Sequence, residues 1–193
     1  MTVLIWGVLG YAALVVPIRP VVAPLSGVVE TRLGPDRAAR WAPLLLHAAV
    51  SALMVLLATL LAGPYEAAAC AVGAVAGHGW PWPRAQRAWP GVPAAAGAFA
   101  ILFPVETAAA ILVLVAARAV RAGRASVTVA LVSLPILAAL RGQPAAFRFA
   151  AWAALVLIAI RRLEGVGADV AEGASPGGAA ARRVILGNSG PHR

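Results

Sequence analysis

"WAPLLLHAAVSALMVLLATLLA", residues 41–62, is the stretch that decides the fold of this chain. A helix needs about 20 consecutive apolar residues to cross a bilayer, and this stretch reaches that length while several others approach it. Hydrophobic residues make up 62% of the 193 residues and charged residues 12%, where a soluble domain carries about a quarter charged residues. The sequence therefore predicts an all-α integral membrane protein.

The hydropathy pattern predicts about seven transmembrane helices, over residues 2–18, 41–62, 65–79, 91–104, 105–121, 125–141 and 145–161. The breaks at Gly63-Pro64 and at Pro104 are of the kind that ends helices. The third and fourth segments are short and rich in Ala and Gly, which suits a packed interior. We expect a membrane domain over residues 1–164 and a largely disordered tail over residues 165–193, because the tail has no helical periodicity and is dominated by Gly, Ala and Ser.

The charge pattern predicts the orientation. The chain has 16 arginines and no lysine, for a net charge of +9. With the N-terminus outside, fourteen arginines fall on the cytoplasmic side and only Arg141 and Arg148 outside. This predicts a multi-pass cell-membrane protein with its N-terminus outside and a cytoplasmic C-terminus. Basic loops are first a topology signal, so nucleic acid is not an expected partner. The absence of lysine excludes Schiff-base and P-loop chemistry.

Few residues outside the arginines point to chemistry. The single cysteine, Cys70, gives no intrachain disulfide, and the three histidines are too far apart in sequence to show a metal-ligand spacing, so no metal or cofactor is expected. His78 ends a predicted helix, where it could act as a base or donate to backbone. His47 lies inside a predicted span, where it is either functional or a neutral imidazole hydrogen-bonded to Ser51. Glu66 and Glu106 begin helices, where the helix dipole favours acids.

The basic cytoplasmic face has two interpretations. Arginine binds phosphate bidentately, so segments carrying Arg84, Arg87 and Arg124 could hold a phosphorylated lipid precursor. The same charges would also serve topology and attract anionic headgroups. The residues alone therefore indicate a polytopic membrane protein with a basic cytoplasmic face.

A family resemblance extends this reading. "GHGWP" at residues 77–81 resembles the G-H-x-W/F-P signature of bacterial acyl-phosphate:glycerol-3-phosphate acyltransferases of the PlsY type, and Gly91-Val92 matches the G-V of their following G-G-K-G-V-A segment. "LLLHAAVSALMVLLA" at 44–58 aligns with the family's L-L-L-D-x-x-K-G-x-x-x-V-L-L-A. "GRASV" at 123–127 resembles the R-Y-V-S-L turn, and "IRRLEGV" at 160–166 resembles R-H-R-E-N-I. The resemblance covers about residues 40–170 and implies a PlsY-like bundle.

Several family positions differ in this chain. The lysine of G-G-K-G falls on Pro90, which has neither a charge nor an amide donor, and the two preceding glycines fall on Ala88 and Trp89. The family's C-terminal histidine and asparagine fall on Arg162 and Gly165, and its N-terminal motif is represented at best by Ser26-Gly27. The phosphate-binding loop is thus degenerate.

The resemblance implies catalytic roles for His78, Ser126 and Glu164, and substrate or phosphate binding by Arg84, Arg87, Gly91, Arg124, Ser26 and Arg32. It implies membrane lipids, acyl-phosphate and glycerol-3-phosphate as partners. Three hypotheses remain open. The chain is a divergent membrane acyltransferase, a non-catalytic paralogue that binds lipid or acts as a scaffold beside a membrane-protein partner, or a small transporter or channel.

Overall fold

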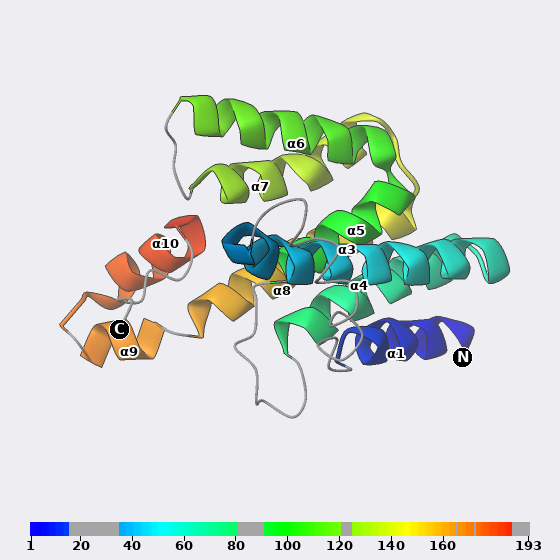
Figure 1. Ribbon diagram of the computed structural model, residues 1–193, viewed down its shortest axis with the longest axis horizontal. Coiled ribbons are helices and arrows are strands. Elements are labelled where there is room, and N and C mark those ends of the chain that lie inside the picture. The colour runs from blue at the N-terminus through cyan, green and yellow to red at the C-terminus, as the bar shows by residue number, and fades with distance from the viewer. Residues whose placement is uncertain (16–34, 81–90, 121–124, 165, 172, 187–193) are drawn as a thin grey trace. The chain divides into compact units, whose positions relative to one another are not determined.

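The computed structural model describes residues 1–15, 35–80, 91–120, 125–164, 166–171 and 173–186. Every regular element in these ranges is an α-helix. The chain divides into two compact units, Met1–Leu102 and Phe103–Arg193, and Figure 1 shows the helices of both. Each unit is built around its own helix packing.

The first unit contains α1 (Thr2–Val15), α3 (Pro35–Leu61), α4 (Pro64–Gly79) and α5 (Val92–Leu102). The turn between α3 and α4 is made by Gly63, whose φ of 125° favours glycine, followed by Pro64 at the start of α4. α1 lies along α4, and α3 packs on α5 (Figure 1). All four helices meet at a small cluster, to which each contributes one residue: Leu14, Val50, Ala74 and Ala94.

Small residues bring the helices of this unit close together. A Cβ added at Gly97 of α5 would lie 1.9 Å from the carbonyl oxygen of Ala48 on α3, so the two backbones are nearly in contact. Most residues of α4 and α5 are buried, among them Ala71 and Ala98 at 0% exposure. The Ala- and Gly-rich segments are therefore the packed interior helices that the sequence predicts.

The second unit contains α6 (Pro104–Ala119), α7 (Ala125–Leu140), α8 (Ala145–Leu163), α9 (Val166–Ala171) and α10 (Pro176–Leu186). α6 packs against α7, and α7 against α8 (Figure 1). Pro104 begins α6, as the sequence predicts. The fully buried Phe103 ring lies 6.5 Å from the Phe147 ring of α8, which anchors the start of α6.

Two short helices lie in the stretch for which disorder is expected from composition. α10 contacts α7, α8 and α9, and Arg183 of α10 donates to the Asp169 carboxylate of α9 at 2.6 Å. These contacts join residues separated along the chain. A hydropathy pattern or a count of Gly, Ala and Ser does not report them.

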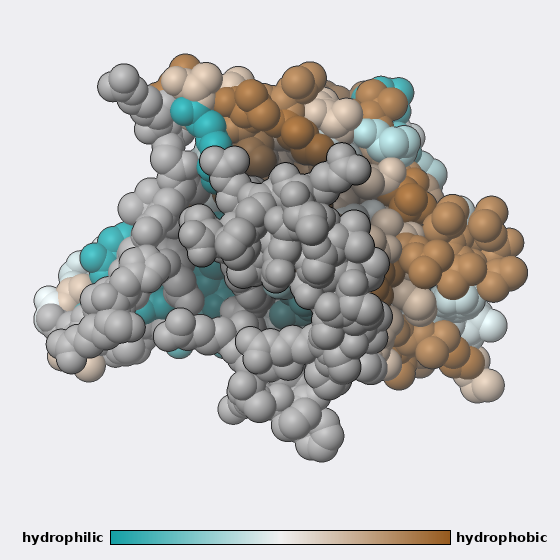
Figure 2. Space-filling view, in the orientation of Figure 1, coloured by the Kyte–Doolittle hydropathy of each residue, from teal (hydrophilic) through white to brown (hydrophobic). Residues whose placement is uncertain are grey.

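Among the described residues, each of the seven predicted apolar segments coincides with one helix, and α3 starts earlier than predicted, at Pro35; residues 16–18 and 121 of the predicted segments lie outside the described residues. By length and apolar composition alone, one helical stretch in the described ranges, Ala42–Leu61, is sufficient to cross a membrane. Thr2–Val15, Val92–Leu102 and Ala125–Leu140 are apolar but shorter. Figure 2 shows hydrophobic surface over α6 and over the end of α3, where Leu60, Leu61 and Leu112 are each about 70% exposed.

Candidate functional site

His78 occupies the last turn of α4, and only 4% of it is exposed. Its Nε2 atom is buried and has no hydrogen-bond partner among the described residues. A buried imidazole nitrogen without a partner is costly, so native structures seldom keep one without a functional reason. His78 is therefore the strongest candidate for chemistry in the first unit.

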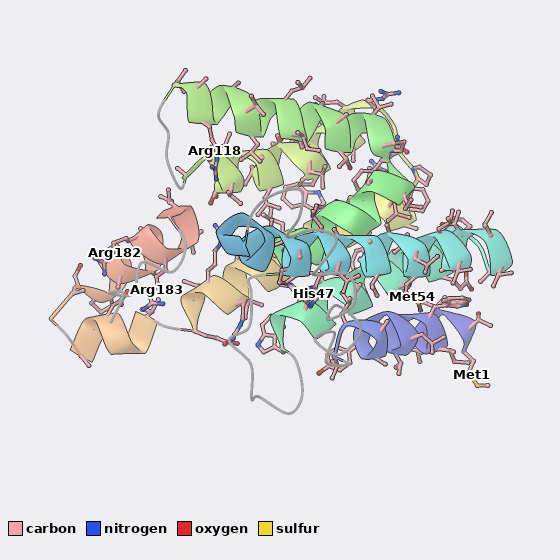
Figure 3. The ribbon with its side chains drawn as sticks, viewed as in Figure 1. Met1, His47, Met54, Arg118, Arg182 and Arg183 are labelled. Atoms are coloured by element: carbon pink, nitrogen blue, oxygen red, sulfur yellow. The ribbon has the colours of Figure 1, made fainter. Side chains whose placement is uncertain are left out.

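His47 of α3 lies beside His78. The two ring centroids are 4.3 Å apart and the rings meet edge to face at 64°. The Nδ1 atom of His47 lies 2.5 Å from the Pro43 carbonyl oxygen. Because a carbonyl only accepts, Nδ1 carries the proton. Figure 3 labels His47 on α3.

The hydrogen bond considered between His47 and Ser51 is not the one that forms. Ser51, which is fully buried, donates to the Ala94 carbonyl oxygen of α5 at 2.8 Å. The neighbouring helix offers that carbonyl at close range because Gly97 allows α5 to approach α3. The polar residues of α3 are thus used for two purposes, with Ser51 joining helices and His47 contacting His78.

Trp80 and Gly91 are the described residues that flank residues 81–90, and the backbone of each is constrained. The Tyr11 hydroxyl of α1 donates to the Trp80 carbonyl oxygen at 2.9 Å, which holds the chain just after His78. Gly91, at the start of α5, is buried and has a φ of 73°, a conformation that side-chain-bearing residues rarely adopt. The backbone conformation at position 91 therefore favours glycine on its own account, whether or not Gly91 binds substrate.

Ser126 and Glu164, the other predicted catalytic residues, belong to the second unit. Ser126 is fully buried in the first turn of α7, and Glu164 directly follows α8 and forms an ion pair with Arg161. The remaining predicted site residues lie outside the described residues: Ser26, Arg32, Arg84, Arg87 and Arg124.

A polar cluster in the second unit was not predicted from the sequence. Arg162, which is 7% exposed and stands where the PlsY family has a histidine, donates from Nη1 to Thr128 Oγ1 at 2.6 Å and to the Val184 carbonyl oxygen at 2.7 Å. Hydrogen bonds from Arg183 hold the pKa of Asp169 at about 2, below its usual value of 3.8. The sequence pattern around an arginine at a helix end does not show whether its side chain is buried or is exposed in a loop, so this role of Arg162 could not be predicted.

The described elements are all α-helices, and the first unit contains a histidine pair in which His78 is buried and His47 is half-buried. The fold of the chain is that of PlsY. A crystal structure of PlsY (YgiH), an integral membrane glycerol 3-phosphate acyltransferase, in its lysophosphatidic acid form matches with a TM-score of 0.68 over 89% of this chain and 93% of that chain, at 18% identity. The glycerol 3-phosphate form matches with a TM-score of 0.67 over 89% and 94%, also at 18% identity. No protein-family model and no curated protein matches the chain. The resemblance seen in the sequence is thus confirmed in the fold.

Proposed function

We propose that this chain is a divergent membrane acyltransferase of the PlsY type. It transfers an acyl group from acyl-phosphate or a similar donor to glycerol-3-phosphate or an altered acceptor in phospholipid synthesis. The observation that carries the proposal is the buried His78, with its unpartnered Nε2, in the "GHGWP" segment of a chain whose fold matches PlsY. The PlsY structures that match were solved in glycerol 3-phosphate and lysophosphatidic acid forms.

The proposed reaction needs a base and does not need a protein nucleophile. The acceptor hydroxyl oxygen attacks the carbonyl carbon of the acyl-phosphate, and a new ester bond forms. The bond from that carbon to the phosphate oxygen breaks, and inorganic phosphate leaves. The hydroxyl proton passes to His78 Nε2, the buried nitrogen that has no hydrogen-bond partner among the described residues. Holding both substrates together supplies much of the remaining rate.

Phosphate binding is assigned to the arginines. Arg84, Arg87 and Arg124 would hold phosphate oxygens through bidentate guanidinium contacts, aided by Gly91, Ser26 and Arg32. Guanidinium groups would thereby replace the lysine, whose position is Pro90, and the close backbone approach that glycines would allow at the positions of Ala88 and Trp89. Ser126 and Glu164 are the other proposed catalytic residues, as the family resemblance implies.

The proposal places the chain in the cell membrane as a multi-pass protein. The N-terminus would lie outside, and residues 165–193 would lie on the cytoplasmic side, as the arginine distribution favours. Membrane lipids would be its partners, with phosphorylated substrates entering from the basic cytoplasmic face.

The test is acyl transfer by the purified protein in lipid, given a long-chain acyl-phosphate and glycerol-3-phosphate, with phosphate release as the readout. His78→Gln keeps a hydrogen-bonding group near the Nε2 position but removes the basic nitrogen, so we expect turnover to fall by about 100-fold or more. His192→Gln changes a histidine at the far end of the sequence and is the matched control.

A second variant separates binding from chemistry. The double variant Arg84→Ala, Arg87→Ala should raise KM for glycerol-3-phosphate strongly, because two phosphate-binding groups are lost. Unchanged substrate binding in this variant would overturn the arginine assignment. No turnover by the wild type, in lipid where PlsY is active, would overturn acyl transfer to this acceptor and favour a different acceptor or a scaffold role.

A further inference from the structure

The histidine pair brings together two of the three histidines in the chain from two different helices. His47 lies in the first half of α3 and His78 in the last turn of α4, and their rings meet edge to face with centroids 4.3 Å apart. Such ring contacts have a preferred geometry and add to simple burial. The orientation of one ring therefore depends on what holds the other.

The His47 ring is held by its own helix. The Nδ1 proton is donated to the Pro43 carbonyl oxygen at 2.5 Å, one turn earlier in α3. This hydrogen bond fixes both the direction of the ring and the nitrogen that carries the proton. The His47 side chain therefore has a fixed orientation and does not rotate freely.

Among the described residues, no carboxylate pairs with the His78 ring, although a carboxylate commonly orients a catalytic histidine. In such sites an acid binds the second ring nitrogen and sets the tautomer. Glu66, the acid of α4, is twelve residues before His78, about 18 Å along the helix, and it accepts a hydrogen bond from Thr2. The His47 ring, in edge-to-face contact with the His78 ring, lies where it can restrict the orientation of that ring.

We infer that His47 is a positioning residue that fixes the orientation of the His78 ring, so that Nε2 of His78 faces the acceptor hydroxyl. This inference rests on the proposed acyl transfer for its functional meaning. The ring contact itself does not depend on that activity. The PlsY-type pattern has an acid at the position of His47, so the histidine pair departs from that pattern.

Two substitutions each remove one of the two interactions of His47, the ring contact with His78 or the hydrogen bond to Pro43. His47→Phe keeps a ring against His78 but loses the donor to Pro43, whereas His47→Asn keeps a donor near Nδ1 but loses the ring. Both variants should lower kcat by about 10- to 100-fold with KM for glycerol-3-phosphate nearly unchanged, because a displaced base harms the chemical step and not binding. Thermal unfolding of each variant in detergent confirms that it is folded.

A second readout does not require activity. Protein labelled with 15N-histidine contains three imidazoles, and His192→Gln identifies one of them by removing its signals. We expect both His47 variants to shift the ring-nitrogen resonances of His78, since its neighbour and its orientation change. His192→Gln should leave the His78 resonances in place.

The outcomes are distinct. Unchanged His78 resonances in both folded variants would overturn the inference, whatever the activity. Shifted resonances with kcat unchanged would overturn the positioning role in catalysis. If the wild type gives no turnover with glycerol-3-phosphate, acyl transfer to this acceptor fails, and the resonances alone then decide whether His47 orients His78.

Discussion

Gly73 of α4 lies so close to Gly7 of α1 that a Cβ at Gly73 would stand 2.0 Å from the Gly7 carbonyl oxygen. The same contact continues one turn later, where a Cβ at Gly77 would stand 2.4 Å from the Tyr11 carbonyl oxygen. The two helices therefore meet backbone to backbone over a stripe of small residues. This contact sets the position of α4, whose last turn carries His78.

Gly73→Ala should destabilise the first unit. The new methyl group would meet backbone atoms, which cannot move aside as a side chain would, so we expect a loss of about 1–3 kcal/mol or more in the free energy of unfolding. Gly79→Ala is the matched control on the same helix, since a Cβ there meets nothing within 4 Å. Thermal unfolding in detergent measures both. Equal midpoints for the two variants would contradict the close packing.

Ser51→Ala should weaken the contact between α3 and α5. The hydroxyl of Ser51 is fully buried and donates to the Ala94 carbonyl oxygen of the other helix, so its loss should cost about 1 kcal/mol of unfolding free energy. Thr59→Ala on α3 is the control, because Thr59 donates to Val55 within its own helix. The difference in unfolding midpoint between these variants is the measurement. A larger loss for Thr59→Ala would refute the assignment.

The positions of the seven apolar helices could be predicted from sequence, because apolar runs broken by Gly and Pro report helix length directly, whereas α9 and α10 could not. The pairing of His47 with His78 could not, since it depends on how α3 and α4 pack. The two acids show the same limit. Glu66 and Glu106 both begin helices, yet Glu106 is buried, at 1% exposure, while Glu66 is half-buried and its hydrogen bond from Thr2 is exposed. The spacing of residues along one helix does not show which residues of another helix will lie beside them.

Glu106→Leu should destabilise the second unit. Glu106 Oε1 accepts from Gln143 Nε2 at 2.6 Å and pairs with Arg141 Nε at 3.2 Å. Removing the carboxylate leaves the Gln143 amide without this acceptor, for an expected loss of about 1–3 kcal/mol in unfolding free energy. Glu66→Leu, which removes an exposed hydrogen bond from Thr2, should cost well under 1 kcal/mol. Thermal unfolding of the two variants decides, and similar losses would contradict the buried role.

The contact between α9 and α10 should depend on pH only in acid. Two hydrogen bonds from Arg183 lower the pKa of Asp169 from 3.8 to about 2. Because the folded pKa is the lower one, the contribution of this pair is complete above about pH 4 and is lost as the pH falls through about 2. A carboxyl 13C NMR titration measures the pKa. Arg183→Met should raise it toward 3.8, and a wild-type value already near 3.8 would contradict the pairing.

The last prediction concerns how α10 is held against α7 and α8. Arg162 donates to Thr128 Oγ1 and to the Val184 carbonyl oxygen, while Thr128 Oγ1 also donates to the Ile185 carbonyl oxygen at 2.8 Å. A cation at the C-terminal carbonyls of a helix is favourable. Arg162→Met should therefore speed amide hydrogen exchange in α10 by about 10- to 100-fold, since a hydrogen bond from a charged donor contributes about 1.5–3 kcal/mol.

The adjacent arginine gives the control for this prediction. Arg161 pairs with Glu164 three residues on, and both side chains are partly exposed, so Arg161→Met should change exchange in α10 by less than about threefold. Arg182 and Arg183, labelled on α10 in Figure 3, are unchanged in both variants. If α10 exchanges equally in the two variants, the hydrogen bonds of Arg162 do not hold α10, and the prediction is wrong. In that case the buried guanidinium of Arg162 stabilises α8 and not α10.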